Sequence, residues 1–188
     1  MVNDRVDTAI KRARSGVGDE RDFECLHEYL KSPDENHDRI YQAVTNYLKH
    51  AKIVDWGIAA NYVNYPEDPL VSATTISMAS IGACPDKSFW NWVLEIAKGV
   101  DWDSENDARV QALLALSRMP GGCAEARDII RSSLLSDWNS VRDSAAIAAQ
   151  RCFGRKESDV VIVGSSGRLI ESVGTEVLNW IWPDRDIS

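Results

Sequence analysis

The sequence predicts an all-α protein in which antiparallel helical hairpins stack on one another as a solenoid. Apolar residues recur at helical spacing along almost all of the 188 residues. Proline and glycine divide the chain into segments of ordinary helix length. A short motif with a valine among small residues occurs three times, at Val71, Val110 and Val141. Its spacings of 39 and 31 residues fit helical-hairpin repeats with connections of variable length.

Four helices are expected before the first of these motifs. The first stops at Gly16, the second before Ser32 and Pro33, and the fourth, over 54–65, before Pro66. The third lies between them. The apolar stripes of the first three are Val6, Ala9 and Ile10, then Phe23, Leu26 and Leu30, then Ile40, Val44, Tyr47 and Leu48.

The first repeated unit contains two helices with clear start and stop signals. Asp68 is a good N-cap with Pro69 at the first helical position, and this helix runs to Gly82. Asp86 caps the second helix, which stops at Gly99. Its stripe is Phe89, Val93 and Ile96.

The next helices follow the same plan. Ser104, with Asp107 three residues later, has the spacing of a capping box, and "MPGG" ends that helix. A returning helix is expected over 124–135, and the last helix begins at Asp137 or Asn139. Their predicted core positions are Val110, Leu113, Leu114, Leu116, Ala126, Ile129, Ile130, Leu134, Val141, Ala145, Ala148 and Cys152.

The chain is predicted to form a single domain over 1–188, with N-terminal helices in 1–66 and repeats in 67–154. The segment 155–188 departs from the pattern. It contains a β-branched run, a Gly-Ser-Ser-Gly turn and the stretch "VGTEVLNWIWPD". A β-hairpin over 155–171 followed by a short capping helix is the expected structure of this end, because a solenoid needs an atypical unit at its terminus.

The phrase "DWNSVRDSAAIAAQRCFG" resembles the conserved helix of HEAT-like repeats of the phycobilisome-lyase type. "DPLVSATTISMASIG" fits less well, with Ser72 in place of the arginine, and Arg109 precedes its valine. The resemblance covers about 68–154 and implies a HEAT-like α-solenoid. It also implies that Asp137 and Arg142 belong to a ladder of side chains that links successive repeats.

The charge pattern narrows the class of partner. The net charge is −8, and 54–154 holds 8 basic and 13 acidic residues. An acidic surface repels phosphate backbones and attracts basic proteins. Binding to DNA or RNA is therefore disfavoured, and so is a base-excision activity, which requires it. No stretch resembles a membrane span or signal peptide. We therefore expect a cytoplasmic protein that does not bind membranes.

Acids and tryptophans coincide at two inter-helix connections. "DWDSENDAR" has the alternating acids of an EF-hand loop, but Asn106 and Ala112 replace its required Gly and Glu, so we expect no metal. Trp is favoured at interfaces. The predicted partner-binding residues are Asp101, Trp102, Asp103, Glu105, Asp107, Asp137 and Trp138. Elsewhere, Trp90 and Trp92 are two apart on one helix and cannot both face inward.

No pattern of catalytic residues is present in the sequence. The three histidines are isolated, and "VVIVGSSGRL" lacks the spacing of a nucleophile turn or a phosphate loop. The four cysteines form no C-x-x-C pair and are expected to be reduced. We therefore expect no enzyme and no cofactor, but an inhibitor or immunity protein that binds a basic toxin such as a nuclease. The alternative is a chromophore-lyase-like or chaperone protein with a ligand pocket.

Overall fold

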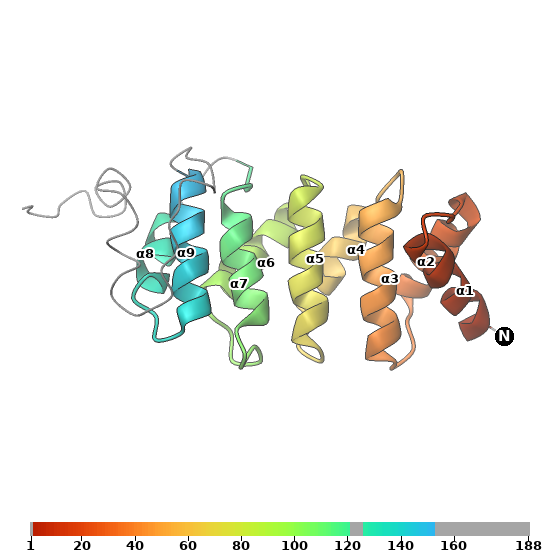
Figure 1. Ribbon diagram of the computed structural model, residues 1–188, viewed down its shortest axis with the longest axis horizontal. Helices are drawn as coiled ribbons and strands as arrows, with labels where there is room; N and C mark the ends of the chain where they lie inside the picture. Colours follow the sequence, from red (N-terminus) through yellow and green to blue (C-terminus); the bar gives the residue numbers. More distant parts are fainter. Residues whose placement is uncertain (1, 121–125, 153–188) are drawn as a thin grey trace, which may run out of the picture. The chain divides into compact units, whose positions relative to one another are not determined.

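The computed structural model describes residues 2–120 and 126–152, and all regular structure in these residues is helical (Figure 1). The chain divides into two compact units, Met1–Phe89 and Trp90–Ser188, which are treated one at a time below. The all-α prediction is confirmed for the described residues. The hairpin expected over 155–171 and the final helix lie outside them. Among the described helices, none is long and apolar enough to cross a membrane.

The first unit contains five helices. They are α1 (Val2–Arg14), α2 (Glu20–Lys31), α3 (His37–His50), α4 (Trp56–Tyr62) and α5 (Pro69–Ile81). Helix α1 packs against α2 and α3, and α5 packs against α3 and α4. Helices α3 and α5 lie side by side and run in the same direction (Figure 1). This arrangement buries the predicted stripes of the first three helices, except that Phe23 stays partly exposed.

Aspartates cap three helices of the first unit, α2, α4 and α5. Asp68 accepts the Leu70 N–H at 2.9 Å, with Pro69 at the first helical position as predicted. Asp19 caps α2 in a capping box with Asp22. A side-chain oxygen positioned in this way satisfies backbone N–H groups that have no partner within the helix.

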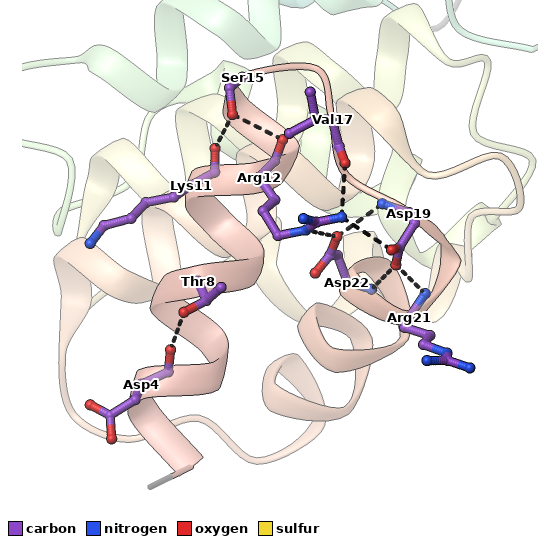
Figure 2. A network of polar contacts seen from close by, with 9 residues as sticks. All are labelled: Asp4, Thr8, Lys11, Arg12, Ser15, Val17, Asp19, Arg21 and Asp22. Carbon is purple, nitrogen blue, oxygen red and sulfur yellow. Dashed lines mark hydrogen bonds and ion pairs between the residues drawn. The ribbon is translucent and has the colours of Figure 1, made fainter.

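The α1–α2 connection is fastened by Arg12 (Figure 2). Its Nε donates to Asp22 Oδ2 at 2.8 Å, and one Nη donates to Asp19 and to the Val17 carbonyl oxygen. Although burial alone would raise the pKa of Asp22, its bonds from Arg12 and the Asp19 N–H lower that pKa below its ordinary value. Both acids of the capping box are therefore already paired.

The second unit contains α7 (Asp107–Leu116), α8 (Arg127–Ser133) and α9 (Asn139–Cys152), and α6 (Lys87–Lys98) crosses the boundary between the units. Helix α9 packs against both α7 and α8. It is buried around much of its circumference, at small residues above all: Ser144, Ala145, Ala146, Ala148 and Ala149. Small side chains let neighbouring helices approach closely, as the alanine-rich phrase predicts.

Helix α6 confirms two predictions made from its sequence. Asp86 caps it, accepting the Ser88 N–H at 2.7 Å and the Phe89 N–H at 3.3 Å. Trp90 is 5% exposed and Trp92 is 40% exposed, so the two rings do face different ways. The helix ends before Gly99, whose φ of 107° only glycine adopts without strain.

The cysteines differ from the prediction at one described position. Cys25 and Cys84 carry free thiols, but Cys152 is disulfide-bonded, so the expectation that all four are reduced is wrong there. Cys123 lies outside the described residues. A disulfide requires the fold to bring two Cα atoms within about 7 Å, and spacing along the chain does not reveal that proximity.

Candidate functional site

The connection from α6 to α7 supplies most of the predicted acids. Asp101, Glu105 and Asp107 are exposed, and Trp102 is half-buried. Asp107 is the first residue of α7, where a negative charge favours the helix. These three carboxylates face solvent and are available to a partner.

Asp103 has a different role from its neighbours. It is 4% exposed, and its carboxylate accepts the backbone N–H groups of Ala108 at 3.3 Å and Arg109 at 2.8 Å. Asn106 precedes the helix in the left-handed conformation and makes no side-chain cap. The prediction that Ser104 caps this helix is therefore wrong, because the turn at Asn106 brings Asp103 under the first amides instead. Asp103 positions the loop and is not a surface acid.

The turn between α8 and α9 supplies the other predicted residues. Asp137 is exposed and Trp138 is 49% exposed. Leu135, which the sequence analysis did not single out, is 65% exposed. The signal was the Leu134–Leu135 pair at a helix end, since adjacent residues there cannot both reach the core. Leu134 is the buried member.

Both connections lie at one end of the second unit. Helices α7 and α9 pack against each other and run in the same direction, so the segments that precede them emerge at the same end (Figure 1). We call this surface the acid–tryptophan end. Its residues are Asp101, Trp102, Glu105, Asp107, Asp137 and Trp138.

The nearest arginines do not neutralise this end. The segments 99–108 and 134–141 contain no lysine or arginine. Arg109 Nε donates to the carbonyl oxygen of Ala97 at 3.3 Å, and burial lowers its pKa against the attraction of Asp103. Arg142 is buried and donates to the Ser136 carbonyl oxygen and to Asn139 Oδ1. The Arg109 guanidinium is thus bound to a backbone carbonyl, and that of Arg142 to a backbone carbonyl and to the Asn139 side chain.

The two residues of the predicted ladder lie at the start of α9 but in different surroundings. Arg142 is buried and bound to the turn, whereas Asp137 is exposed. The partners given above for Arg142 do not include Asp137. A ladder between successive repeats stays a prediction.

Within 2–120 and 126–152, no group of three or more His, Cys, Asp or Glu side chains is placed to hold an ion. In the EF-hand-like stretch, Asp103 is committed to backbone amides. The arrangement is chemically suited to attract cationic groups and to cover an apolar contact.

Comparisons of this chain with protein-family models, curated proteins and solved structures found no match.

Proposed function

We propose that this protein is a non-catalytic binding module, a HEAT-like α-solenoid whose acid–tryptophan end grips a basic protein. In this proposal the bound protein is a toxin such as a nuclease, and binding neutralises it, as an inhibitor or immunity protein does. The observation that carries the proposal is the exposure of Trp138 and Leu135 beside Asp137, at the same end as three further exposed acids.

The physical argument has two parts. Exposed acids without a basic neighbour raise the rate of encounter with a cationic protein and keep nucleic acids away. Tryptophan at the centre of an interface, covered by the partner, supplies a large share of the affinity. Cys152 is disulfide-bonded, and disulfides are rare in cytoplasmic proteins. We therefore propose no cytoplasmic location, although the sequence led us to expect one.

The test is a comparative pull-down from extracts of the cells that make the protein. Three tagged baits are used beside the wild type: D101N/E105Q, W138A and the control E95Q/D128N. The control removes two charges from the exposed ion pairs Glu95–Lys98 and Asp128–Arg131, which contribute little to stability. We expect one basic protein, released by salt, to bind the wild type and the control.

The same protein should bind D101N/E105Q and W138A about tenfold more weakly than the wild type. The first variant removes charge attraction, and the second removes the aromatic contact. Equal recovery on all four baits, or recovery of acidic proteins only, contradicts the proposal.

A further inference from the structure

The first unit contains a groove of about 930 Å³ that the proposed function does not use. It lies between the end of α1, one face of α2, and the connection from α3 to α4. All of its lining residues belong to the first unit, so it is a feature separate from the acid–tryptophan end.

Apolar side chains form part of the groove wall. Phe23 and Tyr47 line it from α2 and α3, and Ile53 and Val54 line it from the connection. Ile53 is 87% exposed, which leaves almost its whole side chain in water. An apolar group seated in the groove would cover this side chain and remove its surface from water.

Two carboxylates of the groove have no cation. Glu20 and Glu24 are exposed on α2, one helical turn apart, and neither forms an ion pair with a described residue. Like charges at this spacing destabilise a helix, and a cation between them would relieve that repulsion. Lys52 is the one lysine or arginine among the lining residues.

The other two acids of the groove are already engaged. Asp19 binds Arg12 and caps α2 (Figure 2). Asp55 binds His27, Oδ2 to Nε2, at 2.9 Å and caps α4. The hydrogen bond from His27 lowers the pKa of Asp55. The pair of free acids is therefore Glu20 and Glu24.

His27 links the walls of the groove. Its Nε2 faces Asp55 at 2.9 Å, its Nδ1 faces Glu28 at 3.5 Å, and its ring stacks on Tyr47 with centroids 5.6 Å apart. These contacts join α2 to the end of α3 and to the α3–α4 connection on the two sides of the groove.

We infer that this groove receives a segment of the basic partner in which a lysine or arginine alternates with an aliphatic residue. The cationic group lies between Glu20 and Glu24, and the aliphatic group lies on Ile53 and Phe23. The inference rests on the proposed function in that the partner is basic. A tetrapyrrole fits less well, because its carboxylates would meet the same two acids.

The test is titration of the isotope-labelled full-length protein with short peptides, followed by NMR chemical shifts. The probes are one peptide that alternates arginine and leucine, one that alternates arginine and serine, and one that alternates glutamate and leucine. We expect the first to bind with shifts confined to 16–27 and 47–55, the second to bind more weakly, and the third not to bind.

Matched variants separate a site from general attraction. E20Q/E24Q should weaken the arginine–leucine peptide about tenfold, and I53S should weaken it several-fold. The control E35Q/E67Q removes two exposed charges of the first unit outside the groove and should change affinity less than about twofold. I53S changes a side chain with no packing role, so misfolding does not obscure its result.

Equal weakening by the control, or shifts spread over the surface, overturns the inference. So does tighter binding of a bilin than of the peptide at 16–27 and 47–55. Failure of the proposed function looks different: the acid–tryptophan variants D101N/E105Q and W138A then leave partner binding unchanged while the groove still takes the peptide.

Discussion

Asp103 caps helix α7 through the backbone of Arg109, with its Oδ2 accepting the Arg109 N–H at 2.8 Å. The guanidinium of the same arginine reaches back to the Ala97 carbonyl oxygen in the last turn of α6. The α6–α7 connection is thus tied at both ends. Arg142 repeats the second half of this arrangement in α9, where it binds the Ser136 carbonyl oxygen of the preceding turn.

Removing the Asp103 carboxylate should destabilise the second unit. D103A leaves two backbone N–H groups at the start of α7 without their acceptor, and we expect a loss of about 1–2 kcal/mol in the free energy of unfolding. Urea denaturation followed by circular dichroism measures it. D103N should recover most of the loss because asparagine also caps, and D101N should have no effect. An equal loss in D101N would contradict the capping role.

Gly99 should tolerate alanine poorly. Its φ of 107° lies where side chains are strained, and an added Cβ would lie 3.4 Å from Arg109 Nη1. We expect G99A to lower the free energy of unfolding by about 1–2 kcal/mol. Gly16 also has a positive φ, of 74°, but open space around it, so G16A is the comparison that isolates the backbone effect. A smaller loss in G99A than in G16A would show that Arg109 moves aside freely.

The contribution of Asp143 to stability should be smaller at neutral pH than in mild acid. Burial raises its pKa, against the attraction of Arg142, and its Oδ1 is buried without a hydrogen-bond partner. As pH rises through the ordinary value near 4, the unfolded chain loses this proton first. The free energy of unfolding then falls until the folded-state pKa is passed, and stays lower above it.

D143N removes this penalty and should raise the free energy of unfolding at pH 7, with no gain near pH 3. Denaturation at the two pH values measures the difference. D137N changes an exposed acid in the turn before α9 and serves as the control. The same gain at both pH values would assign the effect to packing instead of charge.

The cysteines should react in a fixed order with a thiol reagent. Cys25 is partly exposed, whereas Cys84 is buried and burial raises its pKa, so the native protein should be labelled at Cys25 first. Unfolding without a reductant should add Cys84, and only reduction should release the Cys152 thiol. Intact mass and peptide mapping follow each step. Labelling of Cys152 before reduction would show that its disulfide does not form.

The sequence alone determined the features that depend on a few neighbouring residues. The helical stripes, the caps at Asp68 and Asp86 and the opposite facing of Trp90 and Trp92 all follow from spacings of two to four residues, which helix geometry fixes. The exposure of Asp101, Glu105 and Asp107 was also predictable, because charged side chains in connections and at helix starts stay in water unless they are paired. The repeat ladder, the solenoid and the partner stay predictions.

The three-dimensional structure decided the backbone path of the connections and whatever depends on residues that meet across the fold. A left-handed residue at Asn106 moved the cap of α7 from Ser104 to Asp103 and turned a predicted surface acid into a buried one. His27 binds Asp55, 28 residues further along the chain. Both residues line the groove of the first unit, so the groove too depends on this long-range contact. Periodicity shows which side of a helix is apolar, but only packing decides which helix covers it and which surface is left open to a partner.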